Sequence, residues 1–285
     1  MDILTIATII GALAAVVALF LPWVARKLRS KKMMVVKRIQ SPSDQDLIPA
    51  LELYCRSIPE NERDSQETIV RWLQEIEIET KEGRCKLKDY FLVAKVGNRV
   101  AGLLYGQYYP NRGLMFVSFM AVDREYLETR HCLASTALLR YLSRELRRGL
   151  KTCEGIVFEL EYHGSGNKKH DRTCRARMRH FRALARTQNL AVKEIEVGYR
   201  QPKLSLWEGN QKEERQHLMY GRTKPPALST TISRTEVERI LRFLHEDIYG
   251  DHFEDDPGRD REFRLYLNGL YRKLTANLPL AVPLS

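Results

Sequence analysis

The longest uninterrupted apolar segment of the chain spans residues 3–25, in which no side chain is charged. As a helix, this segment would be about 34 Å long, slightly more than the roughly 30 Å hydrocarbon core of a bilayer. Trp23 lies near its end, where an indole favours the membrane interface. The pattern therefore predicts a transmembrane helix over residues 3–25.

A basic juxtamembrane segment, residues 26–32, follows the predicted helix. Because Lys and Arg concentrate on the cytoplasmic side of membrane spans, we expect the C-terminal part of the chain in the cytoplasm. A cleaved signal peptide is the alternative, and it would have a basic start and a shorter apolar core. Here Asp2 makes the start acidic, and the core is too long. The sequence favours an uncleaved anchor in the lipid bilayer.

Between residues 33 and 122, the hydrophobic period alternates between those of strands and helices. Gly97-Asn98 separates two apolar runs, which is typical of a β-hairpin turn. Asp64 and Ser65 supply cap residues for a helix. In order, the pattern predicts a strand at 33–39, helices at 46–58 and 64–82, and strands at 90–96, 99–108 and 114–122.

The second part of the chain continues the alternation and then becomes helical. Lys224-Pro225-Pro226 indicates a linker, and the apolar spacing after it indicates helices packed on the domain, with a dimer contact as the alternative. The pattern predicts a helix at 130–148, a strand at 155–161, a basic helix at 171–186, strands at 191–199 and 215–221, a linker at 223–231, helices at 233–249 and 260–274, and a tail at 279–285.

Composition adds few constraints to this picture. The hydrophobic fraction of 44% and the charged fraction of 29% are those of a globular protein. Five cysteines occur without a Cys-x-x-Cys or Cys/His ligand spacing, so we expect free thiols and no metal. The net charge of +11 is concentrated in residues 26–32 and 168–186, while residues 246–256 are acidic. A charge with local explanations is weak evidence for nucleic-acid binding.

The junction between the strand at 114–122 and the following helix is a candidate anion site. The first N–H groups of a helix have no partner inside the helix, and they can bind the pyrophosphate of a nucleotide-like molecule. The helix start reads Arg130-His131-Cys132-Leu133-Ala134-Ser135. This segment resembles the acetyl-CoA signature of the GNAT superfamily of N-acetyltransferases, Gln/Arg-x-x-Gly-x-Gly/Ala. Leu133 stands where the family has its first glycine.

The resemblance extends over residues 33–222, whose element order is that of the family. Tyr199-Arg200-Gln201-Pro202 and the later His217-Leu218-Met219-Tyr220 are also similar to segments of bacterial GNAT-like proteins. The resemblance implies an α+β domain with a mixed, mostly antiparallel sheet flanked by helices. Residues 223–285 would then form a linker and a C-terminal helical extension. Together with the anchor, this predicts a single-pass protein of the bacterial inner membrane.

The family likeness also implies a function. A GNAT domain transfers an acyl group, usually acetyl, directly from acyl-CoA to an amine, here of unknown identity, and needs no metal. The strand at 114–122 would diverge from its parallel neighbour at 155–161, and the pantetheine arm would lie in the gap. The cofactor-binding residues implied are Met120, Ala121, Val122, Arg130, His131, Cys132, Leu133, Ala134 and Ser135.

Two catalytic residues of the family are replaced in this chain. Phe116 lies where some members have a glutamate, and Phe181 lies at the usual tyrosine. Glu159 and Glu161 are alternative bases, because a two-residue period places both on one strand face, where each could raise the pKa of the other. Tyr162 is the alternative proton donor, with His163 beside it. These replacements leave open a catalytically inactive module that binds or senses a ligand at the membrane.

The basic helix carries Arg172, Arg175, Arg177, Arg179, Arg182 and Arg186. Such a density of arginine suits phosphate groups, an acidic substrate or anionic lipid head groups. The alternative is a solvated face paired with acidic neighbours such as residues 246–256. A lipid- or nucleic-acid-binding adaptor is a third hypothesis, although the chain lacks the aromatic-rich strand that single-stranded nucleic acids require.

Overall fold

The computed structural model describes residues 34–58, 63–82, 88–123, 125–126, 133–148, 152–164, 166–188, 190–202, 214–223, 230–250 and 256–285. The predicted transmembrane helix at 3–25 and the basic segment at 26–32 lie outside these residues, as do Arg130, His131 and Cys132. Within the described ranges, no helix has the length and apolar character needed to cross a bilayer.

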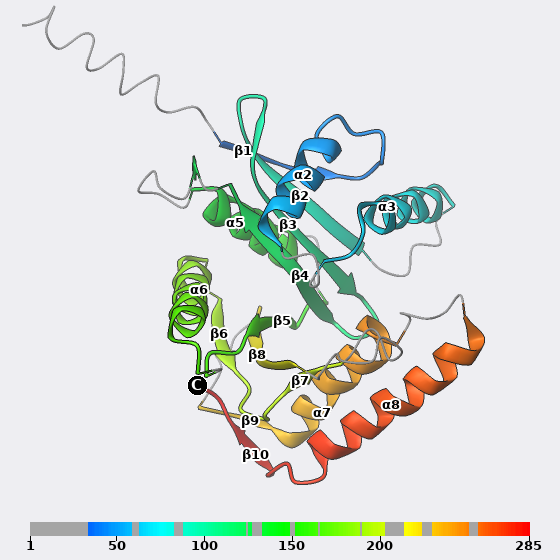
Figure 1. Ribbon diagram of the computed structural model, residues 1–285, viewed down its shortest axis with the longest axis vertical. Coiled ribbons are helices and arrows are strands. Elements are labelled where there is room, and N and C mark those ends of the chain that lie inside the picture. The colour runs from blue at the N-terminus through cyan, green and yellow to red at the C-terminus, as the bar shows by residue number, and fades with distance from the viewer. Residues whose placement is uncertain are drawn as a thin grey trace, which may run out of the picture.

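A mixed sheet of eight strands forms the centre of the fold (Figure 1). Its strand order is β1-β2-β3-β4-β5-β8-β6, and β7 pairs with β8. All recorded pairs are antiparallel except that of β4 with β5. The strands are β1 (Met34–Ile39), β2 (Lys88–Val96), β3 (Arg99–Tyr109), β4 (Leu114–Val122), β5 (Gly155–Glu161), β6 (Ala191–Glu194), β7 (Arg200–Gln201) and β8 (Glu214–Arg222).

The strands predicted at 114–122 and 155–161 are confirmed with the same limits. The predicted hairpin is also confirmed, because β2 and β3 pair around Gly97, whose φ of 64° favours glycine. The predicted strand at 191–199 is only partly correct. The β6 strand ends at Glu194, and β7 begins after Gly198, whose φ of 61° turns the chain.

Helices cover both faces of the sheet. On the face that we call the α6 face, α5 (Leu133–Arg148) and α6 (Lys168–Thr187) pack on Ile156, Phe158 and Met219. On the opposite face, α2 (Leu47–Ser57) and α3 (Gln66–Lys81) cover β2 and β3. The mixed α+β architecture expected from the sequence is therefore observed, and burial of these apolar faces is its main source of stability.

The C-terminal segment covers the rest of that second face, beyond the part under α2 and α3. We call only this remaining part the C-terminal face. It consists of β9 (Thr231–Ser233), α7 (Arg234–Arg242), a π-helical turn η2 (Phe243–Ile248), α8 (Pro257–Thr275) and β10 (Ala281–Pro283). Its apolar side chains share one core with Leu114, Phe116 and Val157 of the sheet. The helix predicted at 233–249 is thus an α-helix that continues as a π-helical turn.

The prediction of a tail at 279–285 is wrong. Strand β10 pairs with β9, and the N–H of Glu194 donates to the carbonyl of Ser285 at 2.9 Å. Val282 and Leu284 are buried while their neighbours are exposed. This two-residue alternation is that of a strand, but over three residues it is too short to recognise in a sequence.

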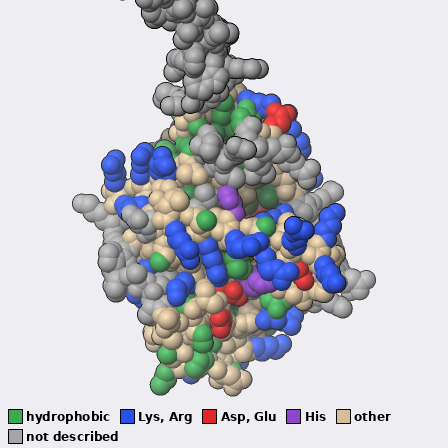
Figure 2. All heavy atoms as spheres, turned by 90° about the vertical axis from the view of Figure 1, so that its left-hand side faces the viewer, with side chains coloured by type: hydrophobic (Ala, Val, Ile, Leu, Met, Phe, Trp, Pro, Cys, Tyr) green, Lys and Arg blue, Asp and Glu red, His purple; other side chains and the backbone are tan. Residues whose placement is uncertain are grey.

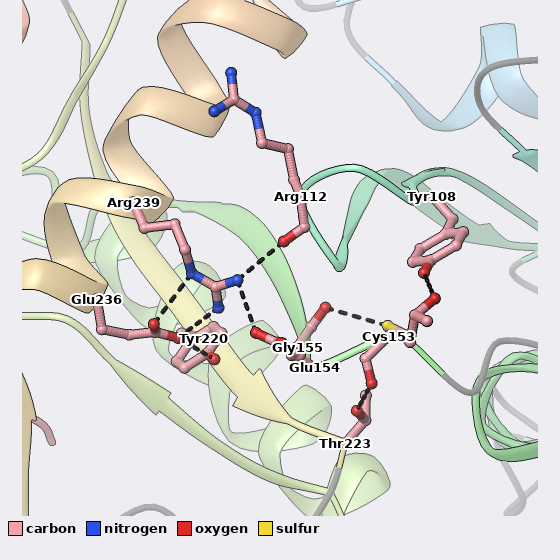
Figure 3. Close-up of polar contacts among 10 residues, drawn as sticks. Tyr108, Arg112, Cys153, Glu154, Gly155, Tyr220, Thr223, Glu236 and Arg239 are labelled. Atoms are coloured by element: carbon pink, nitrogen blue, oxygen red, sulfur yellow. Dashed lines mark hydrogen bonds and ion pairs between the residues drawn. The ribbon is translucent and has the colours of Figure 1, made fainter.

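Ion pairs fasten the C-terminal segment to the sheet (Figure 3). Arg239 of α7 donates to the carbonyl of Arg112 at 2.9 Å and lies 2.8 Å from a carboxylate oxygen of Glu154. Arg239 also contacts Glu236 at 2.7 Å, and the hydroxyl of Tyr220 donates to the same carboxylate. Close packing accompanies these contacts, because a Cβ added at Gly155 would lie 2.3 Å from the Tyr220 ring.

Two of the acidic residues expected beside the basic helix, Glu246 and Asp247, lie elsewhere. Glu246 and Asp247 pair with Arg112, at 2.8 Å and 2.7 Å. Both belong to the C-terminal segment, which lies on the opposite face of the sheet from α6 (Figure 1). Residues 251–255 lie outside the described residues. The arginines of α6 therefore have no ion pair with Glu246 or Asp247.

Candidate active site

Strands β4 and β5 diverge halfway along their length. Their parallel pairing runs from Leu114 and Gly155 to Val117 and Phe158, where the recorded pairs end. On its other edge, β4 has a bulge at Ser118, because Gly106 pairs with Val117 while Tyr105 pairs with Phe119. A bulge bends its strand, and the bend directs the second half of β4 away from β5. We call the stretch beyond Val117 and Phe158, where the two strands no longer pair, the opening.

The predicted cofactor contacts on β4 lie along this opening. Met120, Ala121 and Val122 all follow the last β4–β5 pair. Met120 and Val122 pack towards the α6 face, while Ala121 is buried on the opposite side beneath α2 and α3. The backbone groups that this stretch presents towards β5 have no recorded ladder partner there. They are the groups that an extended amide-containing ligand could pair with.

Glu159 is the first β5 residue beyond the last pair with β4. The hydroxyl of Tyr199 donates to its Oε1 at 2.5 Å, and the hydroxyl of Tyr249 donates to its Oε2 at 2.6 Å. Burial raises the pKa of this carboxyl above its usual value, although both hydrogen bonds act in the opposite direction. Glu159 is therefore a carboxylate with increased basicity at the edge of the opening.

The two tyrosines stay protonated. Burial, and then the charge of Glu159, raise the pKa of Tyr199 and of Tyr249 well above the usual value of a phenol. Tyr199 follows the turn at Gly198, and Tyr249 follows η2, with its N–H donating to the carbonyl of Leu244. Both side chains are thus positioned as donors that orient the carboxylate.

Glu161 has a different environment. Its Oε2 accepts from Arg177 at 2.6 Å and from the thiol of Cys174 at 3.2 Å. The expected effect of Glu161 is not what raises the pKa of Glu159, because burial is the cause of that shift. The end of β5 brings Glu161 against α6, whereas Glu159 contacts residues of the C-terminal face. Strand twist and different partners override the two-residue period.

Three potential metal ligands gather at Glu161. Its carboxylate, a ring nitrogen of His170 and the sulfur of Cys174 lie within 4.8 Å of one another. No motif spacing predicted this group, because one ligand comes from β5 and two from one turn of α6. Arg177 occupies the same oxygen of Glu161, however, and a guanidinium there opposes a bound cation. Burial also raises the pKa of the Cys174 thiol to about 11.

Tyr162 contacts a different set of residues from Glu159. The guanidinium of Arg215 lies 4.1 Å from its ring centroid, and the His217 ring lies 5.0 Å away. His163 stacks beside it at 6.0 Å. Of the three catalytic residues predicted from the sequence, only Glu159 has the two tyrosines as partners.

Comparison of the sequence with protein-family models and with curated proteins finds no match. Solved structures do match. A GNAT-family protein of Bacteroides thetaiotaomicron superposes with a TM-score of 0.51 over 76% of this chain and 98% of that chain, at 18% identity. The chain has the GNAT fold.

Two further neighbours are N-acetyltransferases of known substrate class, at lower structural similarity. The ribosomal-protein-S18-alanine N-acetyltransferase of Escherichia coli has a TM-score of 0.40 and 18% identity, over 68% of this chain and 97% of that chain. An aminoglycoside 6'-N-acetyltransferase complexed with coenzyme A has a TM-score of 0.43 and 13% identity, over 68% and 99%.

The helix that begins beside the opening has the position expected for the GNAT fold. Leu133 is the first residue of α5. Ala134 is buried against Gly102, where an added Cβ would lie 3.1 Å from that of Ala134. Ser135 is 1% exposed, and its hydroxyl lies 3.4 Å from a ring nitrogen of His180 on α6. The Ser135 hydroxyl is thus engaged by α6.

The two phenylalanines at family catalytic positions belong to the core. Phe116 is buried on the C-terminal face, and Phe181 of α6 packs against Phe158 with ring centroids 4.1 Å apart. Sequence reasoning missed Tyr249, because it comes from a segment 90 residues after Glu159. Tyr199 belonged to a recognised motif, but nothing in the hydrophobic pattern paired it with Glu159.

Proposed function

We propose that the protein is a membrane-anchored, acyl-CoA-dependent N-acyltransferase that transfers an acetyl group to an amine. The observation that carries this proposal is the position of Glu159. It is the first residue past the β4–β5 pairing, it has a raised pKa, and two tyrosines hold it. A GNAT fold with a base at this point supports acyl transfer more directly than the fold alone.

The proposed reaction needs one proton acceptor and little else from the protein. Glu159 takes the proton of the amine as the nitrogen attacks the thioester carbon, and the carbon–sulfur bond then breaks. Tyr199 and Tyr249 hold the carboxylate in place, and their raised pKa makes them poor acids. The leaving thiolate therefore takes its proton from solvent. Backbone groups of Met120, Ala121 and Val122 would hold the pantetheine amides of the acyl-CoA substrate.

Calorimetry of the full-length chain with acetyl-CoA tests the binding step. We expect saturable binding, and thiol release that depends on an added amine, measured against a panel of peptide, polyamine and aminosugar acceptors. Glu52→Gln, an exposed substitution on α2, removes the same charge as Glu159→Gln and serves as the control for that variant. Absence of binding at about 1 mM acetyl-CoA, which corresponds to roughly −4 kcal/mol, would refute the proposal.

A catalytically inactive GNAT-fold module is the second candidate. The observation in its favour is that Phe181 packs its ring on Phe158 and has no proton to give. Saturable binding of acetyl-CoA without thiol release toward any tested amine would support this candidate over the enzyme.

We further propose that residues 3–25 anchor the protein in the bacterial inner membrane. Their length and lack of charge support this, and the basic residues 26–32 support a cytoplasmic catalytic domain. Deletion of residues 2–32 should move the protein from the alkali-resistant membrane fraction into the soluble fraction of expressing cells. An unchanged distribution would contradict the anchor.

A further inference from the structure

A cavity lies against α6, and none of its lining residues belongs to β4 or β5. Its volume is about 430 Å³, and it is lined by His163, Arg175, Met178, Arg179, Arg182, Glu194 and Ser285. The lining residues of α6 recur every three to four positions and share one side of the helix. Cys174, Arg177 and Phe181 lie on a different side and contact Glu161 or Phe158. The cavity is therefore separate from the candidate active site.

A chain of hydrogen bonds reaches the cavity from Glu194 at the end of β6, through His217 of β8, to His163 just after β5. Glu194 Oε1 lies 2.6 Å from Nδ1 of His217, and Nε2 of His217 lies 2.7 Å from Nδ1 of His163. The backbone N–H of His163 also donates to Nε2 of His217, at 3.3 Å. Nε2 of His217 is thus an acceptor, and Nδ1 carries the hydrogen that Glu194 accepts. His163 donates through Nδ1, which leaves its Nε2 for a ligand.

The positive groups of the cavity are poorly neutralised by the protein. Arg182 donates to the carbonyl of Ser285 at 3.0 Å. Arg175 and Arg179 are exposed, and no ion pair of either is recorded with a described residue. The carboxylate of Glu194 is engaged by His217. Figure 2 shows the wider surroundings, a surface rich in Lys and Arg over the side of the molecule that contains α5 and α6.

We propose that this cavity binds the phosphomonoester group of a small soluble molecule. Two or three guanidinium groups on successive turns of α6 offer paired N–H donors, the geometry that phosphate oxygens prefer. His163 adds a further donor when it is protonated. The volume exceeds that of phosphate alone, which leaves space for the rest of a metabolite. The inference does not depend on acyl transfer, because the two sites share no residue.

Binding at this site takes up a proton. Burial lowers the pKa of His163, as do the neighbouring His217 and Arg175, while Glu194 and Asp171 act in the opposite direction. A bound dianion would offset the charge of Arg175 and favour protonated His163, whose Nε2–H then donates to a phosphate oxygen. Compared with a variant that lacks the imidazole, the unsubstituted protein should therefore gain affinity as the pH falls through the lowered pKa of His163.

The test is a calorimetric titration of the full-length chain with inorganic phosphate and with phenyl phosphate. We expect one saturable site for each ligand, with Arg179→Gln raising Kd about tenfold or more, since a hydrogen bond to a charged group is lost. His163→Gln should change the pH dependence of Kd relative to that of the unsubstituted protein, while leaving binding at pH 8 within about twofold, because titration of the phosphate itself is common to both proteins. Acetate in place of phosphate should bind more weakly.

The control is Arg261→Gln, which removes an equal charge from the exposed surface of α8. It should leave Kd unchanged. Equal weakening by Arg179→Gln and Arg261→Gln would overturn the proposal, because it would show general charge attraction. A titration with no saturation by about 10 mM phosphate would also overturn it. Binding of phosphate that persists with saturating coenzyme A would show that the cavity is independent of acyl-CoA.

Discussion

Two carboxylates two residues apart on β5 have opposite environments. Glu159 is held by two neutral phenols under the C-terminal segment, and no cation contacts it among the described residues. Glu161 is paired with Arg177, whose side chain is 56% exposed. A carboxylate that keeps its charge without a countercharge is basic and reactive, whereas one paired with arginine is neutralised. The comparison favours Glu159 as the base of the proposed reaction.

The same contrast extends to the two faces of the sheet. The C-terminal face holds two titratable groups without an ion pair among the described residues, half-buried Glu159 and buried His245, beside the ion pairs of Arg112 and Arg239. The α6 face places its titratable groups in pairs and chains, such as Glu161 with Arg177 and Glu194 with His217. Buried, uncompensated groups destabilise a fold, and they persist where they serve a function.

The largest expected effect separates the two glutamates in catalysis. Glu159→Gln should lower the rate of thiol release by about 10²–10⁴, because the amide cannot accept the amine proton. It should leave the Kd for acetyl-CoA unchanged, since it preserves the size and the hydrogen-bonding oxygen of the side chain. Glu161→Gln should retain a rate within a few-fold of the unsubstituted protein. Steady-state kinetics with calorimetry would measure both, and the reverse ranking would refute the assignment to Glu159.

This ranking was only partly accessible from the sequence. Strand limits at 114–122 and 155–161 followed from long apolar runs, and the position of the opening followed from the family likeness. The preference for Glu159 over Glu161 could not be predicted from the sequence. It depends on a hydrogen bond from Tyr249, which lies 90 residues away in the chain. Short strands such as β10 could not be predicted either, because three residues are too few to show a hydrophobic period.

The second expected effect concerns acid stability on the C-terminal face. His245 is 3% exposed, and neither of its ring nitrogens has a hydrogen-bond partner within the described residues. Burial lowers its pKa to about 4. The unfolded chain therefore binds a proton more readily, and stability is lost as the pH falls from 6.5 to about 4. The shift corresponds to about 3 kcal/mol.

His245→Leu should remove that acid-sensitive component. Chemical denaturation between pH 7 and pH 4 would measure it, with the exposed His170 on α6 as the control position in His170→Gln. A parallel loss of stability in the unsubstituted protein and in His245→Leu would show that another group titrates in this range.

A smaller effect compares the hydrogen bonds of the two glutamates. Tyr249→Phe removes a donor from half-buried Glu159 and should reduce the free energy of unfolding by about 1–3 kcal/mol. Arg177→Gln breaks an exposed ion pair and should reduce it by about 0–1 kcal/mol. Urea denaturation at pH 7 measures both. Equal losses would mean that Glu159 is as well solvated as Glu161, against the environment described for the opening.

The smallest effect, and the most specific to Glu159, is a gain of stability. Because burial raises its pKa in the folded state, the folded protein binds the proton more tightly than the unfolded chain does. Stability is therefore present below the unfolded pKa of about 4.3 and is lost as the pH rises through the folded value. Glu159→Gln removes this penalty, so its melting temperature should exceed that of the unsubstituted protein at pH 8 and approach it at pH 4. Glu161→Gln, which breaks an ion pair, should show no such gain. A lower melting temperature of Glu159→Gln at pH 8 would mean that the two tyrosines stabilise the charged carboxylate by more than burial destabilises it, and the pKa of Glu159 would then lie below its usual value.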